Sequence, residues 1–152
     1  MTEPIKIIAG PDPDPKKPIL QLPEGACDSH CHIFGPAEKF PYHPNRSYTP
    51  PDASKYALKN LHDYLGIERA VIVHASCHGT YMDATLDAIA SSDGNYRGTC
   101  IVDPEIRDTE LQRYHEGGIR AVRFNFVKHL ESVPDETVVK RMAERISELG
   151  WH

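Results

Sequence analysis

The sequence predicts an α/β fold built on a parallel sheet, and two features carry that prediction. Short apolar or β-branched runs alternate four times with segments of helical spacing between residues 26 and 149. Each strand-like run is followed by a helix-like one, as right-handed crossovers between parallel strands require. We therefore expect four βα units in one domain over residues 25–152, preceded by an arm over residues 1–24.

The arm is expected to be extended rather than folded into a helix or a central strand. It contains six prolines before residue 25. Proline removes a backbone donor and fixes φ, so this density disfavours both regular structures.

The four expected strands are residues 26–33, 69–75, 98–102 and 119–126. No glycine-rich phosphate-binding turn follows the first of them, which ends in a His-Cys-His sequence instead. A doubly wound sheet and a barrel both fit the alternation. The polar strand end favours a barrel, in which functional groups lie at the carboxyl ends of the strands.

The four expected helices are residues 54–65, 81–91, 108–117 and 134–149. Ser54 and Asp108 are suitable N-caps for the first and third helices. Gly66 and Gly150 are suitable residues just after the first and fourth. In the last helix the apolar residues recur on one face, as a helix covering a sheet requires; they are Val138, Met142, Ile146 and Leu149.

The amino-acid composition of the chain excludes several classes of function. The chain has 152 residues, 39% hydrophobic and 26% charged, which is typical of a globular protein. A net charge of -5 disfavours nucleic acid as a partner. No apolar run approaches the roughly 20 residues that span a bilayer, and no secretory signal is evident, so we expect a cytoplasmic protein without a membrane partner. The four cysteines form no CxxC pair and are expected to be reduced.

The pair His30 and His32 is the main candidate for catalysis. Alternate residues of a strand point to the same side, so Asp28, His30 and His32 are expected to share one face. Both imidazoles could then ligate one divalent metal ion such as Zn or Mn, with one position left open for water. An isolated His-x-His pair is more often a chance or hydrogen-bonded pair, but its place at the end of the first strand favours function.

Further candidates lie at the ends of later strands and in the loops. In the fourth strand Arg123 is expected to face away from the covering helices, whereas Val122, Phe124 and Phe126 face them. Arg123 could bind a substrate carboxylate, or it could form a structural ion pair with a carboxylate of the barrel. The turn over residues 75–80 could line the same site. Tyr42, His43 and Tyr48 lie in the long loop after the first strand; surface packing is the expected role of the first two.

Three separated motifs add a family resemblance. They are CDSHCHIFGP at residues 27–36, ASCHGT at 75–80 and RFNF at 123–126. Over residues 22–152 the chain resembles the amidohydrolase-related family that contains 2-pyrone-4,6-dicarboxylate lactonase. The resemblance implies a TIM (β/α)₈ barrel and hydrolysis of a small carboxylated lactone, as in the degradation of aromatic compounds.

The resemblance also implies roles for individual residues. His30 and His32 would be the catalytic pair of the first strand and its metal ligands if a metal is bound. The lactonase branch of the family works without one, in which case these histidines could polarise the scissile carbonyl directly. The substrate's carboxylate and carbonyl oxygens would be held by Tyr48, Ser76, His78 and Arg123. His129 stands where the resemblance places a second arginine and is a further substrate-binding candidate.

The length predicts only about half of such a barrel, since a complete one needs roughly 250 residues. The later histidine and the aspartate base of the family have no counterpart in this sequence. We therefore expect a truncated hydrolase that is inactive alone. The alternatives are a metal-dependent decarboxylase of the same superfamily, and a non-catalytic half barrel that pairs with itself or with a separate C-terminal half-barrel chain.

Overall fold

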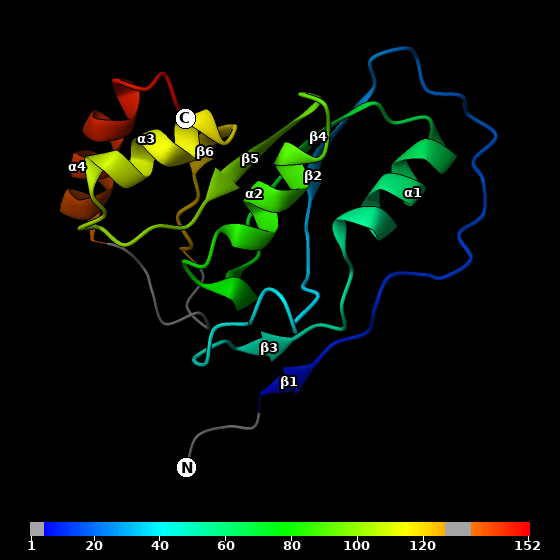
Figure 1. Cartoon of the computed structure of the whole chain (residues 1–152), viewed down its shortest axis with the longest axis horizontal. Coiled ribbons are helices and arrows are strands. Elements are labelled where there is room, and N and C mark those ends of the chain that lie inside the picture. Colours follow the sequence, from blue (N-terminus) through cyan, green and yellow to red (C-terminus); the bar gives the residue numbers. More distant parts are fainter. Residues whose placement is uncertain (1–4, 127–134) are drawn as a thin grey trace.

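The computed structural model describes residues 5–126 and 135–152. Its strands are β1 (Lys6–Ile7), β2 (Cys27–Cys31), β3 (Tyr48–Thr49), β4 (Arg69–Ile72), β5 (Tyr96–Cys100) and β6 (Ile119–Val122). Its helices are α1 (Lys55–Leu65), α2 (Asp83–Ala90), α3 (Asp108–Glu116) and α4 (Glu136–Ser147), with a short 3-10 turn at Ser76–His78 (Figure 1). The four predicted βα units are all present.

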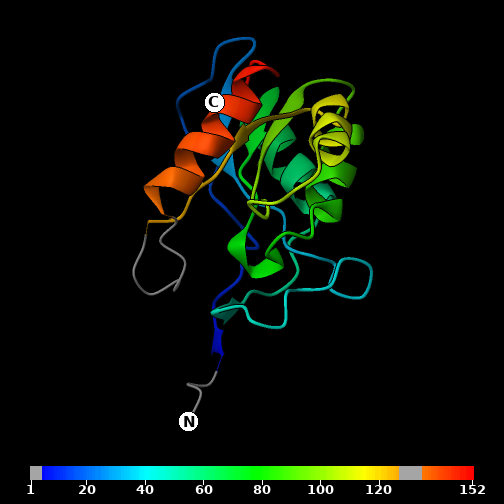
Figure 2. The same cartoon turned by 90° about the vertical axis from the view of Figure 1, so that its left-hand side faces the viewer.

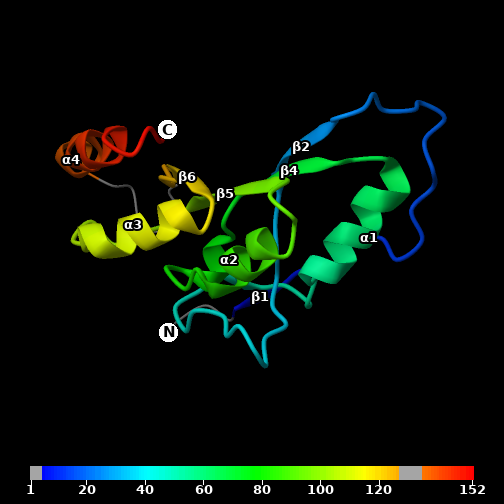
Figure 3. The same ribbon diagram turned by 45° about the horizontal axis from the view of Figure 1, so that its top comes forward.

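A parallel four-stranded sheet organises the molecule, with the strand order β2-β4-β5-β6. Helices α1, α2 and α3 lie along one side of this sheet (Figure 3). The core forms between these layers from buried apolar side chains, among them Ile72, Ala88, Ile89, Leu111, Tyr114, Ile119, Met142 and Ile146. The predicted apolar face of α4 therefore reaches the core through Met142 and Ile146. No helix in residues 5–126 and 135–152 is long and apolar enough to cross a membrane.

The strands end earlier along the chain than predicted. β2, β4 and β6 stop at residues 31, 72 and 122 instead of 33, 75 and 126, and β5 is shifted to Tyr96–Cys100. Beyond these ends, the side chains of His32 and Arg123 bond the carbonyl groups of Val73 and His74, the residues that follow β4. Phe126 is 60% exposed, so its predicted packing under a helix is wrong, whereas Val122 and Phe124 do pack against the core.

The arm contributes one strand that the proline content did not predict. β1 pairs in parallel with β3, which lies in the long loop after β2. Figure 2 shows this small ribbon well away from the carboxyl terminus of the chain. After β1 the arm passes beside α1 before it enters β2 (Figure 1).

The carboxyl-terminal residue continues the sheet at the outer edge of β6. The amide of His152 donates to the carbonyl of Arg120 at 3.1 Å, and the amide of Val122 donates to the carbonyl of His152 at 3.0 Å. One residue bonding to two alternate residues of its neighbour is the pattern of parallel strands. His152 thus takes the position that a fifth strand would occupy.

Candidate active site

A bulge in β2 separates Asp28 from the two histidines. Between Asp28 and Cys31 the pairing of β2 with β4 shifts, so that β2 carries one extra residue. Asp28 consequently lies on the side of α1, where its Oδ2 is 3.2 Å from His62 Nε2. The prediction that Asp28 shares a face with His30 and His32 is therefore wrong. Strict alternation fails because the bulge places two consecutive residues on one side.

The imidazoles of His30 and His32 lie next to each other, as the sequence predicts. Their ring centroids are 5.1 Å apart and the ring planes are nearly perpendicular, at 88°. His30 is exposed and His32 is half-buried. The bulge thus preserves the pairing of the two rings while it turns Asp28 away from them.

A hydrogen bond determines which nitrogen of His32 is available. Its Nδ1 lies 2.7 Å from the carbonyl oxygen of Val73 and must donate, because a carbonyl only accepts. Burial lowers the pKa of His32, and the nearby His30 and Arg123 act in the same direction, so the ring is neutral near pH 7. Nε2 of this neutral ring carries a lone pair, and it has no hydrogen-bond partner within residues 5–126 and 135–152. It can act as a base or a metal ligand, but it cannot donate a hydrogen bond to a carbonyl.

Arg123 lies across the ends of three strands. It follows β6, and its Nη1 donates to the carbonyl of His74 after β4, at 3.0 Å. Because β5 lies between these strands, the guanidinium spans the end of β5. Its Nε bonds Oδ1 of Asn125 at 3.0 Å. Within the part of the chain that the structure describes, Arg123 forms no salt bridge, so the barrel carboxylate expected for a structural ion pair is absent there.

Tyr48 and Ser76 form a second polar group at this end of the sheet. Burial raises the pKa of Tyr48, and the nearby Ser76 side chain opposes that shift. Both side chains are half-buried. The structure therefore joins two of the predicted substrate-binding residues, one from the loop after β2 and one from the turn after β4.

His78 holds two loops together. Its side chain is 1% exposed, its Nδ1 donates to the carbonyl of Pro41 at 3.3 Å, and its Nε2 accepts from the amide of Gly35 at 3.3 Å. A direct contact with substrate would require one of these bonds to break, so that role stays a prediction. His129 lies outside the described residues.

Tyr42 and His43 are half-buried in the long loop after β2. The Tyr42 hydroxyl bonds Asp52 at 3.0 Å, and the His43 ring packs 5.4 Å from that of Tyr81. The first contact lies within the loop and the second joins the loop to Tyr81. Both are packing contacts, the role that the sequence predicts for these two residues.

Comparison with known proteins identifies the family. Residues 27–152 match the family described as Amidohydrolase. The chain belongs to the amidohydrolase family. It is 50% identical over 139 residues to a 2-pyrone-4,6-dicarboxylate hydrolase of Comamonas testosteroni, covering 91% of this chain and 46% of that relative. It is 36% identical over 131 residues to a 4-sulfomuconolactone hydrolase of Hydrogenophaga intermedia, covering 86% and 43% of the two chains.

Solved structures show that the fold is half of an amidohydrolase TIM barrel. A probable 2-pyrone-4,6-dicarboxylic acid hydrolase of Acinetobacter baumannii, solved with citric acid bound, superposes with a TM-score of 0.75 at 23% identity and covers 84% of this chain and 48% of that one. A putative enzyme of the same description from Pseudomonas putida gives 0.61 at 31% identity, covering 86% and 48%. The chain thus spans about half the length of the relatives it matches.

Amidohydrolases often bind divalent metal ions, and His30 and His32 have the donor chemistry for part of such a site. The bare Nε2 of His32 fits a metal ligand, and His30 lies beside it. A bound ion would polarise a carbonyl oxygen or lower the pKa of a bound water.

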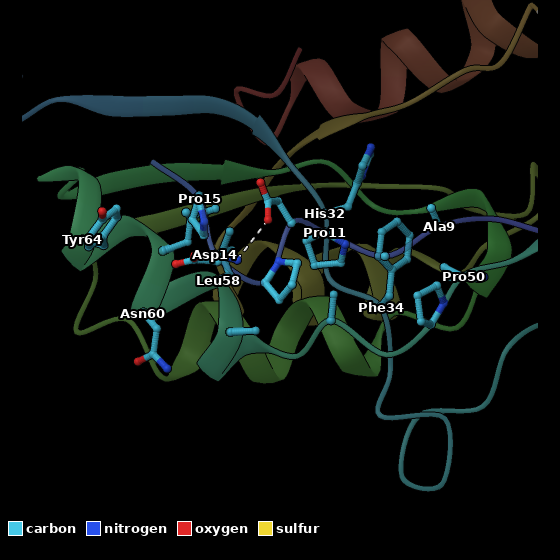
Figure 4. A pocket seen from close by; sticks show the side chains of 17 residues that line it. Ala9, Pro11, Asp14, Pro15, His32, Phe34, Pro50, Leu58, Asn60 and Tyr64 are labelled. Atoms are coloured by element: carbon cyan, nitrogen blue, oxygen red, sulfur yellow. Dashed lines mark hydrogen bonds between the residues drawn. The ribbon is translucent and has the colours of Figure 1, made fainter. Parts of the chain in front are cut away.

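A cavity of about 740 Å³ lies between the arm and α1 (Figure 4). Prolines of the arm, including Pro11 and Pro15, form one wall, and Leu58 and Tyr64 of α1 form another. Of the predicted site residues that the structure describes, only His32 lines this cavity. Arg123 is therefore not part of its wall.

Two further groups of polar side chains were not predicted from the sequence. His74 lies two residues after β4 and is 0% exposed; its Nδ1 is 2.9 Å from Thr85 Oγ1 and its Nε2 is 3.0 Å from the carbonyl oxygen of Gly79. The second group contains Asp28, Cys31 and His62, whose donor atoms lie within 4.8 Å of one another. Its members come from β2 and α1, so no sequence spacing links them. The apolar run around His74 was the only signal that this imidazole is buried.

Proposed function

We propose that this chain carries the first half of the active site of a hydrolase that opens a small carboxylated lactone of the 2-pyrone-4,6-dicarboxylate type. One observation supports this proposal above all: the imidazoles of His30 and His32 and the guanidinium of Arg123 lie at the carboxyl ends of β2 and β6, on the same end of one parallel sheet. That is the end at which barrel enzymes carry out their chemistry. The relatives named for hydrolysing 2-pyrone-4,6-dicarboxylate and 4-sulfomuconolactone support the same reaction class.

Each group has a distinct part in this proposal. Arg123 would bind a substrate carboxylate through paired N–H donors, because a guanidinium matches the geometry of a carboxylate. Tyr48 and Ser76 would bond further substrate oxygens, with His78 and His129 as additional candidates. His32 would act through its bare Nε2 beside His30, either on water directly or as a ligand of a divalent ion such as Zn or Mn.

The reaction itself is a hydrolysis that opens a ring. Water adds to the lactone carbonyl carbon, the ring C–O bond breaks, and the departing oxygen takes up a proton. We propose that the groups handling these protons come in part from a second half barrel, in a further segment or a partner chain, and that the four βα units do not turn over substrate alone. We also propose a cytoplasmic setting, because the four cysteines are unpaired thiols, as a reducing compartment favours.

Calorimetric titration with 2-pyrone-4,6-dicarboxylate tests the proposed carboxylate site. We expect the 152-residue chain to bind it and the variant Arg123→Lys to bind about tenfold or more weakly. Lysine keeps the charge but loses the paired donors, and a hydrogen bond between charged groups contributes about 1.5–3 kcal/mol. Citrate, a non-hydrolysable polycarboxylate, should show the same loss.

Arg120→Lys is the matched control. Arg120 lies in β6, three residues before Arg123, but its guanidinium bonds the carbonyls of His115 and Ile119. This change should leave both affinities within about twofold. Equal weakening in the two variants, or no binding by the unmodified chain, would contradict the proposed site.

A further inference from the structure

A network of hydrogen bonds, buried at His62 and Tyr96 and partly exposed at Asp28, connects α1 and β5 to the backbone of His30. His62 of α1 is 1% exposed; its Nδ1 lies 2.8 Å from the hydroxyl of Tyr96 and its Nε2 lies 3.2 Å from Oδ2 of Asp28. The other oxygen of Asp28, Oδ1, accepts from the amide of His30 at 2.9 Å. One carboxylate thus bonds both the helix layer and the strand that carries the histidine pair.

The position of each proton in this hydrogen-bond network follows from the groups that can donate and those that can only accept. A carboxylate only accepts, so His62 must donate from Nε2. In the tautomer with the proton on Nε2, Nδ1 carries a lone pair and accepts from the Tyr96 hydroxyl. Every polar atom has a partner, which is what makes a buried polar network rigid.

The bulge explains why His30 needs this support. An extra residue in one strand interrupts the ladder, so a backbone amide at the bulge loses its regular partner. Asp28 supplies that partner for the amide of His30. The same bulge turns Asp28 toward α1 and leaves the His30 ring on the side of His32, where the two rings meet edge to face.

We propose that Asp28, His62 and Tyr96 are positioning residues, which fix the bulge in β2 and thereby hold the His30 imidazole against that of His32. This inference deepens the proposed function and rests on it for the catalytic role of His30. The positioning itself is a property of the folded chain and is measurable without substrate.

The neighbouring thiol of Cys31 is engaged in a hydrogen bond of its own and favours its protonated form. The Cys31 Sγ bonds the carbonyl of Val71 at 3.5 Å, and burial raises the pKa of Cys31 to about 12. A protonated thiol is a poor ligand, because metals bind the thiolate. Both nitrogens of His62 are also already bonded.

Amide hydrogen exchange and ring contacts measured by NMR test the proposal. In Asp28→Ala we expect the His30 amide to exchange at least about tenfold faster and the cross-peaks between the two rings to disappear. Asp28→Asn should retain both features, since its amide oxygen can still accept from His30. His62→Phe, which removes the anchor but leaves Asp28, should show an intermediate effect and carries the test if Asp28→Ala does not fold.

Asp63→Asn is the matched control, because Asp63 is adjacent to His62 and pairs with Lys59 at the surface. It removes the same charge and should leave exchange and ring contacts unchanged. Unaltered His30 exchange and ring contacts in Asp28→Ala would overturn the proposal. Stoichiometric Zn binding that Cys31→Ser abolishes would also overturn it, in favour of a metal site. Failure of the unmodified chain to bind 2-pyrone-4,6-dicarboxylate, with these NMR results intact, would count against the proposed function alone.

Discussion

His74 lies two residues after β4 with no exposed surface, and this burial lowers its pKa from 6.5 to about 3. The unfolded chain therefore binds a proton near pH 6.5, whereas the folded protein resists protonation until about pH 3. Stability from this group is complete above pH 6.5 and falls as the pH is lowered toward 3. Each pKa unit corresponds to about 1.4 kcal/mol, so we expect a loss of several kcal/mol, measured by urea unfolding from pH 7 to pH 4.

A variant His74→Gln checks the assignment of this acid sensitivity. Glutamine keeps a donor and an acceptor for Gly79 and Thr85 but does not titrate. The variant should lose less stability on acidification than the unmodified protein does. Identical pH slopes in the two proteins would mean that other groups cause the acid effect.

At the scale of residues, strand periodicity and sequence motifs predicted which side chains lie together at the strand ends. The pairing of His30 with His32 follows from their two-residue spacing, and Arg123 was expected to face away from the helices. Asp28 was misplaced, because nothing in the local sequence reports the extra residue of a bulge. The network of His62 with Asp28 depends on packing between α1 and β2, which a single sequence does not reveal.

At the scale of elements, the turn after β4 depends on the backbone of Gly79. Its φ is +58° and ψ is −121°, a conformation open essentially to glycine, and an added Cβ would lie 2.8 Å from the His43 ring. Gly79→Ala should therefore lower the free energy of unfolding by about 2–4 kcal/mol, from backbone strain plus crowding. Urea unfolding at pH 7 measures this change.

Gly94→Ala provides the comparison, because Gly94 has φ of +84° but nothing within 4 Å of an added Cβ. Only backbone strain should act there, so we expect a loss of about 1–2 kcal/mol. A larger loss at Gly94 than at Gly79 would show that contact with His43 does not constrain the turn.

The number and order of the main elements could be predicted, but their limits could not. Helical spacing and capping residues placed α1 and α4 to within two residues at each end, because those signals are local. β5 began two residues earlier than predicted, since the run Tyr96–Cys100 contains an arginine and a glycine that do not resemble a buried strand. β1 was missed because its partner, β3, lies about 40 residues away and only tertiary contact defines the pair.

At the scale of the whole molecule, the sheet has two open edges. β2 has no neighbour beyond it among the described residues of the sheet, and at the other end only His152 extends past β6. Phe126 is 60% exposed near the carboxyl ends of the strands. Family resemblance and length predicted this half barrel correctly. An open edge and an exposed aromatic ring favour contact with further protein, in a continuing segment or in another chain, because both leave groups that pairing would satisfy.

The open edges predict that the chain associates with a complementary half barrel. We expect the chain alone to form dimers or larger species in size-exclusion chromatography with light scattering. Co-expression with the second half of the Comamonas testosteroni relative, which is 50% identical over 139 residues, should yield a one-to-one complex that hydrolyses 2-pyrone-4,6-dicarboxylate. A monomer that unfolds cooperatively and hydrolyses the lactone unaided would contradict this prediction, because four strands would then supply both a closed fold and a complete site.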